Sequence, residues 1–221
     1  LEHQLHDAGA RALLVFSGVS ATVAEVLAKP DHGLALEAVL SIAPGDGTDA
    51  KLPSPPMGPR LAGTIAFADA LQEGSALSFT PVPLAGDDLL FLQYTGGTTG
   101  LSKGATLSHR NLVANIQQYK AISPGSLRPG EEVIVTAIPL YHIFALMANF
   151  ITYFSVGAHN WLVPNPRDMD AFINVLKASR CTVFTGVNTL FACLVAHPRI
   201  KEVDFSRLRT TRGGGSALLE A

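Results

Sequence analysis

The chain has 221 residues, of which 48% are hydrophobic and 15% are charged, and its formal net charge is -2 at pH 7. This length and hydrophobic content are enough to bury a substantial core in one or two domains. The nearly balanced charge gives no overall basic field, which argues against nucleic acid as a partner.

The first part of the chain, residues 1–86, alternates predicted helices and strands, a pattern typical of α/β folds. Ser20 is a candidate helix cap, and Lys29-Pro30 ends the helix after it. Pro44–Gly63 is rich in proline and glycine and is predicted to be a surface excursion. The predicted elements are a helix over Leu1–Ala8, a strand over Ala12–Phe16, a helix with Val23, Val26 and Leu27 on its apolar face, a strand over Ala35–Ile42, a helix over Ala66–Glu73 and a linker over Pro81–Asp88.

The second part, residues 87–221, continues this alternation, so the whole chain is predicted to form layered sheets flanked by helices. Its segment Val133–Pro166 lacks Asp, Glu, Lys and Arg, but the uninterrupted stretch Ile143–Val156 is too short for a comfortable membrane crossing. A buried helix between two core strands is the better interpretation. The predicted elements are a strand over Ala105–Leu107, a helix capped by Ser108 with Leu112, Ile116 and Tyr119 on one face, a strand over Val133–Ile138, a helix over Ile143–Ser155, a strand over Ala158–Val163, a helix capped by Asp168 with Met169, Phe172, Ile173 and Leu176 at helical spacing, a strand over Cys181–Phe184, a helix over Asn188–Ala196 and a strand over Leu208–Thr211.

The two cysteines, Cys181 and Cys193, lie in apolar sequence at no metal-ligand spacing. We expect both to be ordinary buried thiols, without a disulfide or a catalytic role, which suits a reducing cytoplasm. No secretory signal begins the chain, and both ends have helical character without an initial methionine. We interpret these ends as cuts through a larger protein.

The stretch Tyr94–Gly104, YTGGTTGLSKG, combines four glycines and three threonines with Ser102 and Lys103. Glycine lets main-chain N–H groups turn inward toward a ligand, the hydroxyls add donors, and the lysine adds a positive charge. This combination predicts a polyphosphate site, whereas the glycines alone would indicate a mobile surface turn. The candidate phosphate-binding residues are Thr95, Gly96, Gly97, Thr98, Thr99, Gly100 and Lys103.

This phosphate loop is not a Walker A motif, because that motif ends in Gly-Lys-Ser/Thr and leads into a helix. Lys103 instead lies between Ser102 and Gly104, and a short strand comes next. The phosphates are therefore expected in a hairpin-like loop rather than at a helix N-terminus.

Two further features carry little information alone. A histidine such as His142, between a strand with a proline and an apolar helix, is more often a satisfied core residue. The run Gly213–Ser216 is as typical of a turn that leads into a helix as of a ligand site. It is not a nucleophile elbow, because Leu218 occupies the place of the second glycine.

Together, YTGGTTGLSKG and the nearby Ser108–Leu112 (SHRNL) resemble the nucleotide-binding signature of the AMP-forming acyl-adenylate synthetases. Three later segments resemble bacterial long-chain fatty acid–CoA ligases: Ile138–Leu146 (IPLYHIFAL), Gly186–Phe191 (GVNTLF) and Gly213–Ser216 (GGGS). The likeness runs through nearly all of the chain. It implies part of the large N-terminal domain of an acyl-adenylate-forming enzyme, with residues 1–86 an incomplete subdomain and residues 87–221 carrying the phosphate loop and the acyl and adenine pocket.

The resemblance implies an enzyme that activates a long-chain fatty acid with ATP to an acyl-adenylate and transfers the acyl group to coenzyme A. The phosphate loop would hold the β and γ phosphates and offset the charge that develops as pyrophosphate leaves. Lys103 would assist as a point charge.

His142 is, by this resemblance, the candidate catalytic residue, because it would lie beside the α-phosphate and the substrate carboxylate. An imidazole there can donate a hydrogen bond and order the reacting groups. One face of the helix over Ile143–Ser155, with Val187 and Asn188, would line the acyl channel. The adenine-contacting residues would be Gly214, Gly215 and Ser216.

The scattered histidines and carboxylates show no metal-ligand pattern, and Asp87-Asp88 is better interpreted as the end of a linker. The resemblance places the acidic ligand of Mg²⁺ and the mobile C-terminal domain with its catalytic lysine beyond Ala221. The chain as given is therefore expected to be inactive.

Two other classes of protein stay open: a fatty acyl–AMP or aryl acid adenylating ligase, and a non-enzymatic nucleotide-binding module. A cytoplasmic location is expected, and a lipid substrate is compatible with peripheral contact at the inner face of the membrane. The sequence does not indicate the acyl chain-length preference or the oligomeric state.

Overall fold

The computed structural model describes residues 1–48, 61, 63–95, 100–123 and 125–215. The chain divides into two compact units, Leu1–Leu107 and Ser108–Ala221. Both are α/β, with parallel sheets flanked by helices, as the alternation of elements predicts. The subdomain boundary expected between residues 86 and 87 stays a prediction; the division into units falls later, at the end of the strand behind the phosphate loop.

The first unit contains a parallel sheet with the strand order β1–β2–β3. Its core forms where Val23 and Ala24 of the second helix pack with Val15 of the first strand and with Leu61. Leu61 is buried, while most of the predicted excursion Pro44–Gly63 lies outside the described residues. The elements are α1 (Glu2–Asp7), β1 (Ala12–Phe16), η1 (Ser17–Val19), α2 (Ser20–Leu27), β2 (Ala38–Ile42), β3 (Ile65–Ala66) and α3 (Phe67–Gly74).

Two further strands, β4 (Leu89–Thr95) and β5 (Lys103–Ser108), form a two-stranded sheet on either side of the phosphate loop. This arrangement agrees with the predicted hairpin-like loop and with a strand, not a helix, directly behind it. Ser108 then caps the next helix, as predicted: its hydroxyl accepts from the N–H of Asn111, and the Asn111 side chain accepts from the N–H of Ser108.

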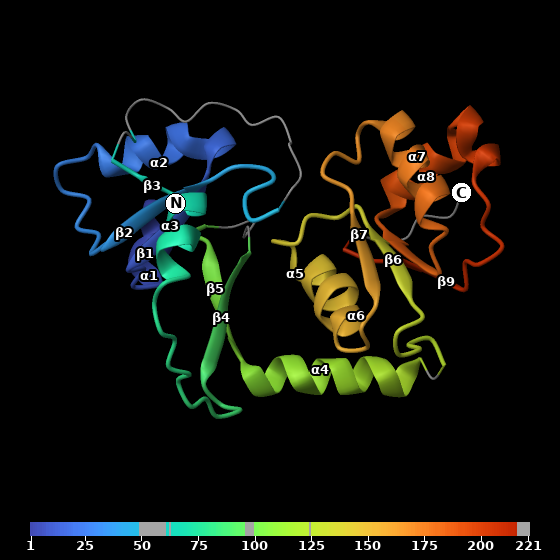
Figure 1. Ribbon diagram of the computed structural model, residues 1–221, viewed down its shortest axis with the longest axis horizontal. Coiled ribbons are helices and arrows are strands. Elements are labelled where there is room, and N and C mark those ends of the chain that lie inside the picture. The colour runs from blue at the N-terminus through green and yellow to red at the C-terminus, as the bar shows by residue number, and fades with distance from the viewer. Residues whose placement is uncertain (49–60, 62, 96–99, 124, 216–221) are drawn as a thin grey trace. The chain divides into compact units, whose positions relative to one another are not determined.

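The second unit is built on a four-stranded parallel sheet with the order β7–β6–β8–β9. Helices α7 and α8 cover one face of this sheet, and α5 and α6 cover the other (Figure 1). The elements are α4 (His109–Ile122), β6 (Val133–Thr136), α5 (Ile143–Ala145), the π-helix η3 (Leu146–Ile151), α6 (Thr152–Phe154), β7 (His159–Leu162), α7 (Met169–Ser179), β8 (Val183–Gly186), α8 (Asn188–Ala196), η4 (Pro198–Glu202) and β9 (Thr210–Gly213).

Successive residues of the central strand β6 point to opposite faces of the sheet, as the strand geometry requires. Val135 packs with Phe172 and Leu176 of α7 in one core, whereas Ile134 packs with Tyr153 of α6 in another. Asp168 caps α7 by accepting from the N–H of Ala171, as the sequence predicts. Because both faces are covered, the central strands β6 and β8 are almost uniformly buried, whereas the edge strands β7 and β9 are partly exposed.

Three sequence predictions need correction. Val19, not Ser20, occupies the N-cap position of α2, and Ser20 is the first helical residue. The strand predicted at Cys181–Phe184 occupies Val183–Gly186; just before it, the Thr182 hydroxyl accepts from the N–H of Val133, and the Thr182 N–H donates to the Val133 carbonyl. Likewise, the last strand reaches Gly213 and includes the first residue of the glycine run.

The thiols also differ from expectation. Both cysteines are free, but only Cys181 is buried, and burial raises the pKa of its thiol. Cys193 is exposed on α8. The sequence of α8 is apolar on all sides, so no polar stripe marks which of its residues face solvent.

The predicted helix over Ile143–Ser155 exists, but its middle turn is a π-helix rather than an α-helix. It lies between β6 and β7, as the interpretation of a buried helix between two core strands requires. Among the described residues, no helix has the length and apolar character needed to cross a membrane.

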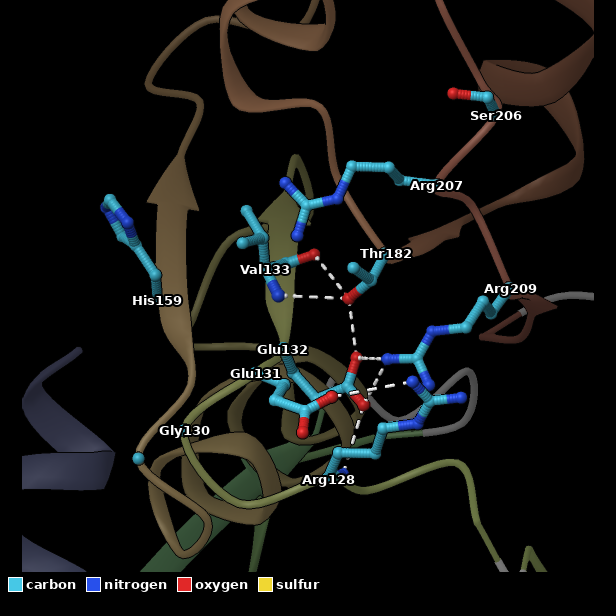
Figure 2. A pocket seen from close by; sticks show the side chains of 11 residues that line it. Arg128, Gly130, Glu131, Glu132, Val133, His159, Thr182, Ser206, Arg207 and Arg209 are labelled. Carbon is cyan, nitrogen blue, oxygen red and sulfur yellow. Dashed lines mark hydrogen bonds and ion pairs between the residues drawn. The ribbon is translucent and has the colours of Figure 1, made fainter.

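At the amino end of this sheet, Glu132 is buried with 1% of its surface exposed. Its carboxylate forms an ion pair with Arg209, accepts a hydrogen bond from the Thr182 hydroxyl, and accepts from the N–H of Arg128 at 3.0 Å (Figure 2). Burial alone would raise the pKa of Glu132, but these bonds outweigh it and hold the pKa below the usual 4.5. This carboxylate therefore stabilises the fold above about pH 4.5, and the stabilisation is lost as pH falls through its lower folded-state pKa.

We predict that Arg209→Leu lowers the free energy of unfolding of the second unit by about 3–5 kcal/mol, because it leaves Glu132 buried without its partner. Trp161 is the only tryptophan and lies in β7, so its fluorescence during urea unfolding reports on this unit. Arg128→Leu is the matched control, since it removes an exposed ion pair with Glu131 and should cost less than about 1 kcal/mol. Equal losses in the two variants would contradict the prediction.

Candidate functional site

Three of the segments singled out in the sequence meet at the carboxyl ends of β6, β8 and β9. Because these strands are parallel neighbours, the segments after them leave the sheet at the same edge, where ligands bind in open α/β folds. Gly186 of β8 pairs with Gly213 of β9, and the N–H of Gly214 donates to the Gly186 carbonyl at 3.3 Å. A Cβ atom built on Gly215 would lie 3.6 Å from Cε1 of His142 and 3.8 Å from Cγ1 of Val187.

His142 is the N-cap residue of α5, and its ring takes part in the cap. Its Nδ1 accepts a hydrogen bond from the N–H of Phe144 at 3.2 Å. A nitrogen that accepts in this way carries no proton, so the ring proton is on Nε2. The side chain is exposed, and Nε2–H is therefore the group that His142 can offer to a ligand oxygen.

Gly214 is a glycine because the Phe144 ring lies directly against it. A Cβ atom at position 214 would lie 2.7 Å from Cε2 and from Cζ of Phe144. This contact joins the start of the apolar helix to the glycine run, so the space beside the Gly214 main chain depends on where the Phe144 ring is held.

A mostly apolar cavity of about 670 Å³ opens at the same edge of the sheet. Ile138 and Pro139 line it from the end of β6, and Val187, Leu190 and Cys193 line it from the end of β8 and from α8. Val187 belongs to the predicted acyl channel, but no residue of the helix over Ile143–Ser155 lines this cavity.

The described part of the phosphate loop lies in the first unit. Thr95, Gly100 and Lys103 line one cavity of about 550 Å³ together with His3 and Asp7 of α1. This grouping of loop residues with α1 has no signal in the sequence. Of the other candidates, Gly96, Gly97, Thr98, Thr99 and Ser216 lie outside the described residues.

Ser102 ties the two ends of the loop together and to α1. Its hydroxyl donates to the Thr95 carbonyl at 3.1 Å and accepts from the Gln4 side chain at 3.2 Å, and its own carbonyl lies 3.0 Å from Nε2 of His3. The loop therefore has a fixed base, formed by Ser102 and by residues about a hundred positions earlier in the chain.

Tyr94 strengthens the same connection. Its hydroxyl donates to the Asp7 carboxylate at 2.5 Å, and this bond raises the pKa of Tyr94 above its usual value of 10. A Cβ atom at Gly104 would lie 2.9 Å from Cζ of this ring, so the last glycine of the motif makes room for Tyr94. In the described part of the chain, no group of three or more His, Cys, Asp or Glu side chains is arranged to hold a metal ion.

The sequence matches a protein-family model described as AMP-binding enzyme over residues 1–221. Over 97% of its length, the chain is 40% identical to a long-chain-fatty-acid–CoA ligase of Salmonella typhimurium. Over 100% of its length, it is 37% identical to a long-chain-fatty-acid–CoA ligase of Yersinia pestis. The chain spans 40% of the first of these relatives and 41% of the second.

Among solved structures, the chain resembles the inhibitor-bound N-terminal domain of FACL13 from Mycobacterium tuberculosis, with a TM-score of 0.78. The match covers 99% of this chain and 48% of that one at 18% sequence identity, so it bears on the fold alone. The chain therefore shares the α/β fold of that N-terminal domain.

We predict that Gly214→Ala lowers the free energy of unfolding of the second unit by about 1–3 kcal/mol, because the added methyl group overlaps the Phe144 ring. Unfolding in urea, monitored by Trp161 fluorescence, measures the loss. The same substitution in a Phe144→Ala background should cost clearly less, since the ring is gone. An unchanged cost in that background would show that the contact does not set the penalty.

Proposed function

The chain belongs to the AMP-binding enzyme family, and from this premise we propose that the protein is an ATP-dependent, AMP-forming long-chain fatty acid–CoA ligase. The observation that carries the proposal is the meeting of His142, Val187 and the glycine run at one edge of a parallel sheet. The relatives named long-chain-fatty-acid–CoA ligase, at up to 40% identity over nearly the whole chain, support the choice of substrate.

The proposed reaction has two steps. In the first, a carboxylate oxygen of the fatty acid attacks the α-phosphorus of ATP, the bond to the bridging oxygen breaks, and pyrophosphate leaves. In the second, the thiol of coenzyme A attacks the acyl carbon and AMP leaves with the electrons of the broken C–O bond. In this proposal the residues of this chain bind and orient the substrates, and none of them acts as a nucleophile.

His142 is proposed to act on the first step. Its Nε2–H can donate to an oxygen of the α-phosphate or to the attacking carboxylate, while the bond from the Phe144 N–H to Nδ1 holds the ring in place. The repulsion between these two negatively charged groups is the main obstacle to their reaction, and a fixed hydrogen-bond donor reduces it.

The phosphate loop is proposed to bind the β and γ phosphates through its hydroxyls, its main-chain N–H groups and Lys103. Thr95 and Lys103 already line a common cavity, and the tie through Ser102 fixes the base from which the loop extends. The adenine is proposed to lie along the main chain of the glycine run, whose Gly214 is packed against the Phe144 ring.

The apolar cavity of about 670 Å³ is proposed to accept part of the fatty acyl chain, since it is mostly apolar and includes Val187. Mg²⁺ is expected to accompany ATP, but none of the described residues is assigned to it. A cytoplasmic location and peripheral membrane contact stay predictions.

The activity is tested with the natural full-length protein, ATP, palmitate and coenzyme A, and the expected products are palmitoyl-CoA, AMP and pyrophosphate. His142→Ala should lower kcat about 100-fold, because it removes one hydrogen-bond donor to developing charge. His159→Ala, an exposed histidine at the other end of the sheet, is the control and should change kcat by less than about twofold. Free acyl-adenylate without thioester would instead indicate an adenylating ligase, and ATP binding without turnover would indicate a nucleotide-binding module.

We further predict that Ser102→Ala raises the KM for ATP about fivefold with little change in kcat. The loop loses the two hydrogen bonds of the Ser102 hydroxyl at its base, which weakens binding equally in the ground state and in the transition state. Initial rates at varied ATP concentration measure this effect. Ser75→Ala, which removes an exposed hydroxyl in the same unit, is the control and should leave the KM unchanged. An unaltered KM in Ser102→Ala would mean that the tie does not hold the loop.

A further inference from the structure

The helix that begins after His142 changes its hydrogen-bond spacing in the middle. At its start the N–H of Leu146 donates to the His142 carbonyl, and at its end the N–H of Ser155 donates to the Ile151 carbonyl, both four residues back. Between them the N–H of Thr152 donates to the Met147 carbonyl, five residues back. One turn therefore contains an extra residue, which is the definition of a π-helix.

This extra residue decides which way the two ends of the helix face. An α-helix has 3.6 residues per turn, so one added residue rotates everything before it by about 100° relative to everything after it. After the π-turn, Tyr153 is fully buried in the core with Ile134 and Val183. Before it, Phe144 lies against Gly214 and His142 lies beside Gly215. With a regular α-helix, only one of these two sets of contacts would form.

Asn149, inside the π-turn, binds the sheet below it through its side chain and is fully buried. Its amide nitrogen donates to the Thr136 hydroxyl at 3.1 Å, and its amide oxygen accepts from the Thr185 hydroxyl at 2.7 Å. Thr136 and Thr185 are the paired residues near the carboxyl ends of β6 and β8. One side chain thus fixes the π-turn to both strands that lead into the site.

The main chain of the π-turn is held in the same network. The Thr136 hydroxyl donates to the amide oxygen of Asn160 on β7 at 2.8 Å, and the amide nitrogen of Asn160 donates to the Asn149 carbonyl at 3.3 Å. The bonds form a closed ring from Asn149 through Thr136 and Asn160 back to Asn149. A buried network in which each amide has partners favours one arrangement, because any shift of the turn would leave buried polar atoms without bonds.

Thr152, on the next turn, shows that burial alone does not bring such bonds. It is as buried as Asn149, yet its hydroxyl has no hydrogen-bond partner. Thr152→Val is therefore a matched control, because it replaces a buried hydroxyl in the same helix by a methyl group of similar size and leaves the network unchanged.

We propose that Asn149 is a positioning residue for the adenylation step: it selects the π-turn and thereby aims His142 at the glycine run. This inference rests on the proposed function, since it assigns Asn149 an effect on the reaction through His142. Asn149 itself contacts the sheet and not the substrates. We therefore expect replacement of Asn149 to lower kcat/KM for the fatty acid when His142 is present, and to have no further effect when His142 is absent.

The test uses the natural full-length protein and measures kcat and KM for palmitate and for ATP. Asn149→Leu should lower kcat/KM for palmitate at least about 10-fold, because small displacements of reacting groups have large effects on rate. Thr185→Val should lower kcat/KM for palmitate by a smaller factor. Thr185→Ser keeps the hydroxyl and should have wild-type values, and so should Thr152→Val.

A double variant separates positioning from general damage. If Asn149 acts through His142, then Asn149→Leu combined with His142→Ala should be no slower than His142→Ala alone. Additive losses would overturn the proposal, as would wild-type kinetics in Asn149→Leu. If Asn149→Leu does not fold, the comparison of Thr185→Val with Thr185→Ser decides, and equal kinetics in that pair would reject the role. A wild-type protein without any adenylation would refute the proposed function instead, whatever the variants do.

Discussion

The parallel pairing of β6, β8 and β9 is the constraint on which the candidate site depends. Main-chain hydrogen bonds set the register, with Thr136 opposite Thr185 and Gly186 opposite Gly213. Because parallel strands end at one edge, segments that are distant in sequence leave the sheet side by side. The geometry of the backbone, rather than contacts between side chains, therefore brings together His142, Val187 and Gly215.

Polar groups are buried at both ends of this sheet, and they differ in charge. At the amino end the carboxylate of Glu132 is neutralised by Arg209, whereas near the carboxyl end the network around Asn149 contains only neutral amides and hydroxyls. Because this network carries no charge, the electric field at this edge of the sheet comes from the ligand and from groups such as His142. Between the two ends the faces of the sheet are apolar, so each polar group fixes the strands at a defined position along their length.

Much of the fold could be predicted from local pattern, because helices and strands of this chain are marked by periodicity and caps. Asp168 and Ser108 cap the helices expected of them, and β1 and α8 occupy the predicted residues. The features that could not be predicted depend on contacts between distant residues. The π-turn at Asn149 exists because of partners on three strands, and the tie from Ser102 to α1 joins residues that share no local signal. The meeting of His142 with the glycine run was expected from resemblance and not from periodicity, since it requires the strand order.

The ion pair between Glu132 and Arg209 joins residues 77 positions apart, and this separation affects how the second unit is made. A ribosome completes β6, β7 and β8 before it adds Arg209. Until then the Glu132 carboxylate lacks the partner of its buried ion pair, so it favours solvent and the amino end of the nascent sheet stays open. Because non-local pairing of this kind also slows folding, the unit is expected to close late in translation, with its apolar strand faces available to chaperones until the last strand emerges.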